Sequence, residues 1–329
     1  MKVDEAGNVY LAGFRIGQGT GWDFLCIKYR PNGDTAWVRR NYWAGIGADA
    51  YRLALDRTGV VVCGYRYDAS YNIDIAVIKY SPDGDSLWAD VFDGGWQNSD
   101  AGLRVASGPN GSSYVAGVVN HEGNNNYMVV AKYLADGTRE WVVRYGDTLD
   151  YRNDWPYGIV TDEQGNCYVC AHSVSSRDGN SILTVKYAPD GSEVWHTLYT
   201  PEQDGTDVCG IALSGTSYVY VVGAGQYPGR FWDCVTIKYD QTLGIAETPG
   251  AGHPKLNTVP TVIRGVLNLQ VDSRPHSAYR AELIDISGRR VMELQPGAND
   301  VSRLAPGVYF VRSADTGKQS VLRRVVITR

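Results

Sequence analysis

The sequence predicts an all-β protein, and three observations on its 329 residues support that fold class. It contains 38 glycines, 23 tyrosines and nine tryptophans, a composition typical of strands joined by tight turns. The repeated units described next contain no segment with the 3.6-residue apolar period of a helix. Short apolar runs are instead separated by Pro, Asn, Asp and Gly, the pattern of antiparallel strands.

An internal repeat of about 52 residues occupies the first three quarters of the chain. Its marker is the tripeptide Ile27-Lys28-Tyr29, which recurs around Lys79, Lys132, Lys186 and Lys238. After each of the first four copies, a turn such as Pro82-Asp83-Gly84 leads to a tryptophan. These tryptophans are Trp37, Trp88, Trp141 and Trp195. A strand with a Gly-Asn-x-Tyr pattern precedes the tripeptide, so each copy predicts four short strands, a to d in chain order.

Four-stranded antiparallel units of this length are typical of β-propeller blades. We therefore expect residues 1–245 to form a β-propeller of about five visible blades. The first copy begins at strand b and the last ends at strand c, so both end blades are expected to be incomplete. We interpret this as a start inside a longer protein; an open ring, or an irregular segment that fills the gap, are the alternatives.

The repeat resembles a known group of bacterial sequences. The succession G-N-x-Y-x-x-G, I-K-Y and P-D-G-x-x-x-W is similar to the SBBP-type β-propeller repeats of secreted and surface proteins. The resemblance covers about residues 1–240 and implies a fold and an extracellular setting. It implies no particular activity, because propellers carry unrelated functions.

The last part of the chain predicts a second domain. Residues 246–257 have linker composition, and residues 258–329 alternate apolar and polar positions, which indicates a small Ig-like β-sandwich. Residues 283–291, 304–311 and 324–327 resemble the type A C-terminal sorting domain of type IX secretion cargo. That resemblance implies recognition by the type IX machinery, export, and a secreted or outer cell-surface location. The chain starts without the signal peptide that such cargo needs; an ordinary Ig-like accessory domain is the alternative.

Charge and hydropathy exclude two classes of partner. Residues 1–249 contain 19 Lys and Arg against 30 Asp and Glu, a net charge of −11, whereas residues 250–329 contain 12 against 6, a net charge of +6. The acidic repeat region argues against nucleic-acid binding. No apolar stretch reaches the ~18 residues of a membrane span.

Motifs for chemistry are sparse. The sequence lacks G-x-S-x-G, H-E-x-x-H and a phosphate-binding loop, and its five histidines are scattered, so we assign no catalytic residue, metal or cofactor. The repeat alignment predicts that Cys26, Cys63, Cys167, Cys170 and Cys234 are small core fillers rather than disulfide partners. It also predicts structural roles for the repeated lysines, paired with acids such as Asp23, Asp74 or Asp233, and for the repeated tryptophans.

A ligand is expected at one face of the repeat region. Antiparallel order places the short a–b and c–d turns on one face and the long, variable b–c and d–a loops on the other. Variable loops on a rigid scaffold are the usual place for binding. The candidate binding residues in them are Trp43, Asp93, Trp96, Asp154, Trp155, Tyr227 and Arg230. They suit sugar rings or a protein surface, although such aromatics can also simply pack the loops.

Three functional hypotheses follow. The first is a non-enzymatic exported interaction module that binds a glycan or a surface protein. The alternative is a secreted carbohydrate-active enzyme with its acids on the variable-loop face. A quinone-dependent dehydrogenase is the third. The small number of histidines and the lack of a dedicated metal cluster in the sequence disfavour it.

Overall fold

The computed structural model describes most of the chain. The described residues are 1–17, 21–41, 43, 47–95, 99–121, 125–146, 152–176, 179–200, 205–216, 218–227, 230–241, 261–263, 266–269, 280–285, 289–295, 297–314 and 321–327. They divide into two compact units, residues 1–248 and 249–329. Apart from a short 3₁₀ turn at Pro109–Gly111, the regular structure of the described residues is all β, as predicted.

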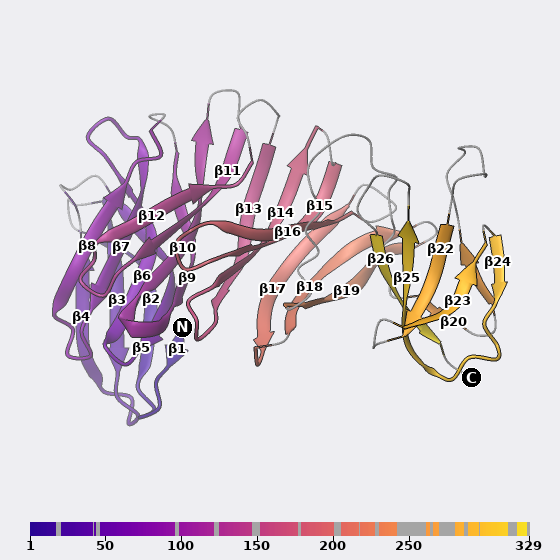
Figure 1. Ribbon diagram of the computed structural model, residues 1–329. Helices are drawn as coiled ribbons and strands as arrows, with labels where there is room; N and C mark the ends of the chain where they lie inside the picture. The colour runs from indigo at the N-terminus through magenta and orange to yellow at the C-terminus, as the bar shows by residue number, and fades with distance from the viewer. Residues whose placement is uncertain are drawn as a thin grey trace. The chain divides into compact units, whose positions relative to one another are not determined.

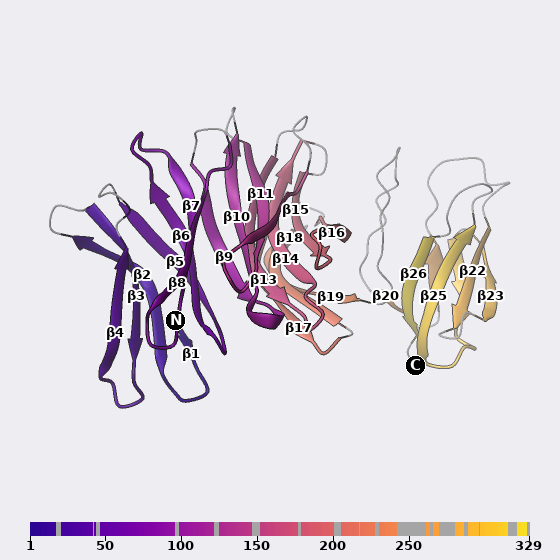
Figure 2. The ribbon, with the colours of Figure 1, turned by 60° about the vertical axis from the view of Figure 1, so that its left-hand side comes forward.

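The first unit consists of five successive groups of antiparallel strands, each called a sheet below (Figures 1 and 2). The first contains β1 (Lys2–Val3), β2 (Val9–Gly17), β3 (Gly21–Tyr29) and β4 (Thr35–Asn41), and the second β5 (Ala48–Asp56), β6 (Gly59–Tyr67), β7 (Ile73–Tyr80) and β8 (Ser86–Phe92). The third contains β9 (Ala101–Ser107), β10 (Ser113–His121), β11 (Asn125–Tyr133) and β12 (Arg139–Arg144), and the fourth β13 (Arg152–Thr161), β14 (Cys167–Ser175), β15 (Gly179–Tyr187) and β16 (Glu193–Tyr199). A parallel bridge between β11 and β13 joins the third and fourth groups into one eight-stranded sheet. The fifth is described over β17 (Thr206–Ser214), β18 (Tyr218–Tyr227) and β19 (Arg230–Asp240). The predicted four-stranded units are therefore confirmed.

The first sheet corrects one expectation, because it does contain a strand at position a. Lys2 and Val3 pair with Tyr10 and Val9. The Asp4 carboxylate accepts hydrogen bonds from the backbone N–H groups of Ala6 and Asn8, which closes the turn that folds β1 back onto β2. The same Asp-x-x-Gly-Asn motif forms the equivalent turn at Asp162. The motif therefore predicts a strand before β2 as well.

Each sheet packs on the next through apolar side chains. Tyr10, Phe24 and Trp37 of the first sheet form one buried cluster with Val60 and Ile78 of the second. Equivalent clusters lie between the later sheets. Strands β5, β9, β13 and β17 contact one another in sequence, and we call them the inner strands. The sheets therefore form a continuous packed row, whose core lies between their faces.

The repeated tryptophans hold neighbouring sheets together, as predicted. The Trp37 indole donates to the Pro82 carbonyl at 3.0 Å, and Trp141 donates to the Pro189 carbonyl at 2.9 Å. Both acceptors belong to the c–d turn of the following sheet. In the equivalent turn of the third sheet, Gly137 has a φ of +89°, and a Cβ there would lie 2.5 Å from Trp88 Cγ. Glycine is therefore needed at this position both for the turn conformation and for the close approach of the Trp88 indole from the preceding sheet.

The repeated lysines also link sheets, but with partners other than those predicted. Lys79 is 1% exposed, and its Nζ donates to Asp56 at 2.8 Å and to the Gly111 carbonyl at 2.9 Å. The expected partner, Asp74, pairs instead with Arg66 at 3.1 Å. The prediction was wrong because five residues of strand separate Asp74 from Lys79 by about 16 Å and turn their side chains to opposite faces.

Cysteines fill the core at four of the five predicted positions. Cys26, Cys63, Cys167 and Cys170 are buried free thiols, and burial raises the pKa of Cys26 and of Cys63 to about 12. Such thiols are poor nucleophiles at neutral pH. Cys234 is exposed, contrary to the prediction, because it lies on the last described sheet of the row.

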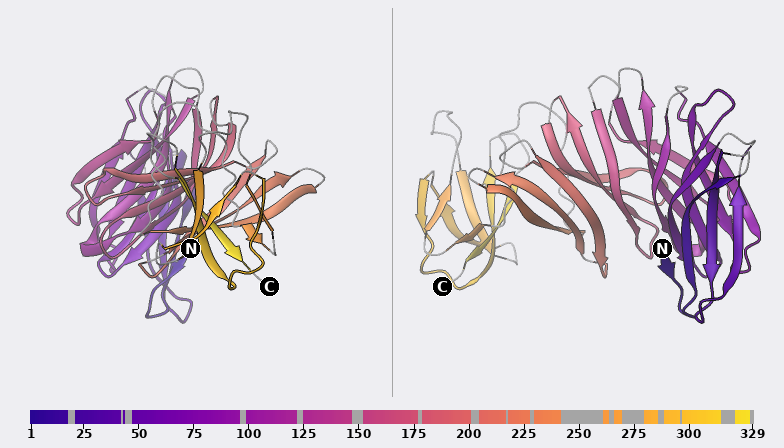
Figure 3. Two further views of the ribbon diagram at one scale, coloured as in Figure 1. Left: turned by 45° about the vertical axis from the view of Figure 1, so that its right-hand side comes forward. Right: turned by 180° about the vertical axis from the view of Figure 1, so that it is seen from behind.

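The second unit contains two sheets (orange and yellow in Figure 3). Its strands are β20 (Thr261–Ile263), β21 (Val266–Leu269), β22 (Arg280–Asp285), β23 (Arg290–Leu294), β24 (Gly297–Asp300), β25 (Gly307–Ala314) and β26 (Val321–Ile327). The five-stranded sheet has the order β20-β26-β25-β22-β23, and β21 pairs with β24. Leu267 of the smaller sheet shares a buried cluster with Leu283 and Val311 of the larger, so one core joins the two sheets. Among the described residues, no helix is long and apolar enough to cross a membrane.

Candidate functional site

The strand ends that lead into the d–a and b–c connections lie along one side of the row, which we call the loop face. A parallel bridge joins Ile73, at the start of a c strand, to Ser99, which precedes the next inner strand. Asn126 and Asn153 form the equivalent bridge one sheet later. Because these bridges align the strand ends, side chains from adjoining sheets lie together at this face.

Two of the predicted tryptophans are partly enclosed there. Trp43 packs edge-on against Phe24, with ring centroids 5.5 Å apart, in the cluster between the first two sheets. Trp155 is half-buried at the start of β13, and its indole donates to Asn153 Oδ1 at 2.7 Å. Trp43 is thus mainly a packing residue, whereas Trp155 is held in place and keeps part of its ring exposed.

The remaining predicted residues are placed unequally. Asp154 is fully buried and accepts a hydrogen bond from Ser173 Oγ at 2.5 Å, so it anchors β13 to β14 rather than facing solvent. Trp96 lies outside the described residues. Tyr227 and Arg230 are paired in the β18–β19 register, and nothing beyond their backbone is described. Binding by these residues stays a prediction.

Asp93 belongs to a cluster of three carboxylates. It is exposed, and its Oδ1 accepts from Gly95 N at 2.8 Å. Nearby Asp100 is 2% exposed and accepts from Gly94 N at 2.6 Å and Asn120 N at 3.0 Å. Burial raises the pKa of Asp100 to about 6, and the charges of Asp93 and Asp74 add to the rise. Asp100 therefore fixes the Asp93 loop and holds a proton more readily than an ordinary aspartate.

Amide side chains connect adjoining sheets at the same face. Asn120 Nδ2 donates to Asn126 Oδ1 at 3.0 Å, and Asn126 Nδ2 donates to Asn153 Oδ1 at 2.8 Å. One sheet later, Asn180 Oδ1 accepts from Thr206 Oγ1 at 3.1 Å. The Asn153 side chain of this network accepts the Trp155 indole N–H and so orients that ring.

The inner strands carry a feature that the sequence analysis missed. Each has a β-bulge at the same position, where one extra residue disturbs the register with the b strand. The extra residues are Tyr51, Leu103, Tyr157 and Cys209. Tyr51 is 37% exposed and Tyr157 is 38% exposed. Because these four positions hold two tyrosines, a leucine and a cysteine, no shared residue type identifies the bulges in the sequence; the pairing register does.

Tyr51 belongs to a row of tyrosines on the second sheet. Its ring lies 5.4 Å from that of Tyr65, which lies 5.5 Å from that of Tyr67, and both contacts are edge-to-face. Burial raises the pKa of Asp49 beside them. The row runs from the bulge toward the loop face, with the buried ring of Tyr65 between the more exposed rings of Tyr51 and Tyr67.

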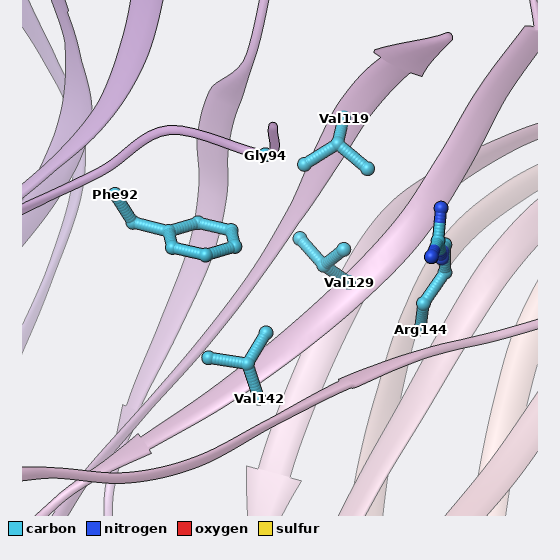
Figure 4. Close-up of a pocket in the computed structure, with 6 residues that line it drawn as sticks. All are labelled: Phe92, Gly94, Val119, Val129, Val142 and Arg144. Atoms are coloured by element: carbon cyan, nitrogen blue, oxygen red, sulfur yellow. The ribbon is translucent and has the colours of Figure 1, made fainter. Parts of the chain in front are cut away.

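A cavity of about 220 Å³ lies between the second and third sheets (Figure 4). It is lined by Phe92, Gly94, Val119, Val129, Val142 and Arg144. Figure 4 shows Phe92 and Arg144 on opposite sides of the three valines. This volume is below that of most small-molecule sites. Within the described part of the chain, no cluster of three or more His, Cys, Asp or Glu side chains is placed to hold a metal ion.

Comparisons with known proteins complete the description. No family model matches the chain, and no curated protein matches it significantly. A thermostable family-43 glycoside hydrolase is similar at 14% identity and a TM-score of 0.37, over 77% of this chain and 99% of that one. A puromycin hydrolase mutant complexed with PGG is 13% identical, with a TM-score of 0.44, over 95% of this chain and 42% of that one.

The extracellular domain of a hybrid two-component system from B. thetaiotaomicron is 12% identical, with a TM-score of 0.33. That likeness covers 99% of this chain and 49% of the other. The chain thus spans less than half the length of the last two structures. All three TM-scores are below 0.5, so the proposals that follow rest on this chain's own residues.

Proposed function

We propose that the chain is a non-enzymatic, exported β-propeller that binds a glycan or a surface protein through its loop face and inner strands. One observation carries the proposal: partly exposed aromatic rings recur on the inner strands. Tyr51 on β5 and Tyr157 on β13 occupy the same bulge position. Trp155 lies two residues before Tyr157 on β13, and its indole is hydrogen-bonded to the Asn153 side chain. Aromatic rings beside amides and carboxylates provide both stacking and hydrogen bonding to a polar ligand.

A glycan array probed with the full chain tests this proposal. We expect Trp155→Ala to weaken binding to any captured glycan by about tenfold, because stacking of one ring contributes on the order of 1 kcal/mol or more. Leu87→Ala is the control, since Leu87 is 49% exposed on the outer strand β8. Equal binding by both variants would place the ligand elsewhere.

We further propose that residues 258–329 are the type IX sorting domain and that the repeat region is its cargo. The motif resemblance and the basic charge of this module support the assignment. The test expresses the chain, preceded by a signal peptide, in a type IX-competent host, with and without residues 249–329. We expect only the full chain to leave the periplasm; export of the truncated chain would refute the sorting role.

A carbohydrate-active enzyme is the second candidate, and the Asp93–Asp100 arrangement favours it. Two nearby carboxyl groups, one exposed and one with a pKa of about 6, provide the unequal environments that acid and base roles require. The test is a polysaccharide-hydrolysis screen with the full chain and with Asp93→Asn. Turnover that disappears in Asp93→Asn would establish the enzyme and end the binding-module proposal.

A further inference from the structure

Two arginines follow the bulges of neighbouring inner strands. Arg52 on β5 and Arg104 on β9 occupy the same register position, directly after Tyr51 and Leu103. Each guanidinium folds back on its own bulge: Arg52 Nη1 donates to the Tyr51 carbonyl at 2.8 Å, and Arg104 Nη1 donates to the Leu103 carbonyl at 2.7 Å. The two side chains are therefore held alike on adjacent strands.

Arg104 also reaches the next inner strand. Its Nε donates to the Tyr157 carbonyl at 2.5 Å, and its guanidinium carbon lies 5.4 Å from the centre of the Tyr157 ring. Arg104 is half-buried, whereas Arg52 is exposed. Tyr51 directly precedes Arg52 on β5, and Tyr157 lies beside Arg104, so each arginine adjoins a partly exposed tyrosine.

Among the described residues, no carboxylate pairs with either arginine. Arg52 donates to one backbone carbonyl, whereas Arg104 donates to two backbone carbonyls and lies over the Tyr157 ring. Burial and the neighbouring Arg52 charge lower the pKa of Arg104, which places the two cations within electrostatic reach of each other. Each guanidinium has five N–H donors, so several remain for a ligand. Two like charges kept together without a counter-ion are an unfavourable arrangement that an anion relieves.

We propose that Arg52 and Arg104 bind the acidic group of an anionic sugar, with Tyr51 and Tyr157 as platforms for its ring. This inference rests on the proposed binding function and names the class of its ligand. Arginine matches carboxylate and sulfate oxygens in paired hydrogen bonds. The tyrosine rings supply the apolar face on which pyranose rings stack.

The surrounding charge favours a sugar over a polyanion such as a nucleic acid. The repeat region has a net charge of −11 over residues 1–249, so a densely charged chain is repelled outside the two arginines. A glycan whose acidic groups are far apart places one acidic group at a time near the two arginines, so the acidic repeat region repels it less. Acidic peptides share the carboxylate but lack the stacking ring, and the experiment below separates them.

The test is calorimetric titration of the full chain with oligogalacturonate, its neutral methyl ester, a sulfated oligosaccharide of the same length and a polyglutamate peptide. We expect oligogalacturonate or the sulfated sugar to bind, the methyl ester and the peptide to bind at least about tenfold more weakly, and added salt to reduce the affinity. Arg52→Gln and Arg104→Gln should each lose about tenfold. Arg104→Lys should recover part of that loss, because it restores the charge without the planar fork.

Arg57→Gln is the matched control, because Arg57 is exposed in the turn that follows β5. Equal losses of affinity in Arg57→Gln and Arg52→Gln would show that binding depends only on the total charge. That result would overturn the proposed site at Arg52 and Arg104. Preferential binding of polyglutamate would overturn the sugar class. Neutral glycans that bind in a Trp155-dependent manner, unaffected by the arginine variants, would refute this inference and leave the proposed function standing. The absence of binding to every probe would refute the inference and count against glycan binding as a whole.

Discussion

Gly137 shows how a single turn residue sets the spacing between sheets. Its φ of +89° and the 2.5 Å approach to Trp88 both exclude a side chain. We expect Gly137→Ala to destabilise the first unit by about 2–3 kcal/mol in chemical denaturation. Gly33 has the same φ but nothing within 4 Å of its Cβ position, so Gly33→Ala should cost only about 1 kcal/mol. Equal losses would mean that the indole contact contributes nothing.

Asp100 makes the first unit sensitive to pH. Its pKa in the folded protein is about 6, above the ordinary aspartate value, so the folded state binds more protons between about pH 4 and pH 6. The stability contributed by this group is therefore complete below pH 4 and is lost as the pH rises through 6. Urea unfolding from pH 4 to pH 7.5 should show this loss, and Asp100→Asn should reduce the slope. An unchanged slope in Asp100→Asn would contradict the assignment.

Lys79 links separate elements, because it lies on β7 and binds the turn that precedes β10. Its ammonium is buried against Asp56 and the Gly111 carbonyl. We expect Lys79→Met to cost about 3 kcal/mol, since Asp56 would lose its partner. Lys28, at the same position in the first sheet, contacts the Pro82 carbonyl and is less buried, so Lys28→Met should cost less than about 1 kcal/mol. Thermal denaturation of the two variants side by side measures the difference.

The local sequence predicts the strands and turns well where the same turn and packing residues recur in each repeat. Each Pro-Asp-Gly turn, and each tryptophan four residues after its glycine, appears in the structure at the predicted place. The sequence does not predict the inner-strand bulges, because the bulge residues, Tyr51, Leu103, Tyr157 and Cys209, share a register position but not one residue type. Asp154 was predicted as a ligand contact because it follows a variable loop. The structure buries it against Ser173, and that contact depends on strand pairing rather than on local pattern.

At the scale of the whole molecule, the two compact units are expected to unfold separately. Residues 1–248 and 249–329 each have their own buried clusters. A chain ending at residue 248 should therefore retain the main calorimetric transition of the full chain within about 2–4 °C. A large drop in that transition temperature would show that the units stabilise each other.

The central proposal is that this row of sheets binds an extracellular ligand and does not transform it. The most direct test incubates the full chain with a panel of neutral and acidic polysaccharides, and measures bound protein and newly formed reducing ends in the same samples. The account predicts saturable binding that Trp155→Ala weakens, with no increase in reducing ends. Reducing ends that accumulate with the full chain and disappear with Asp93→Asn would contradict it.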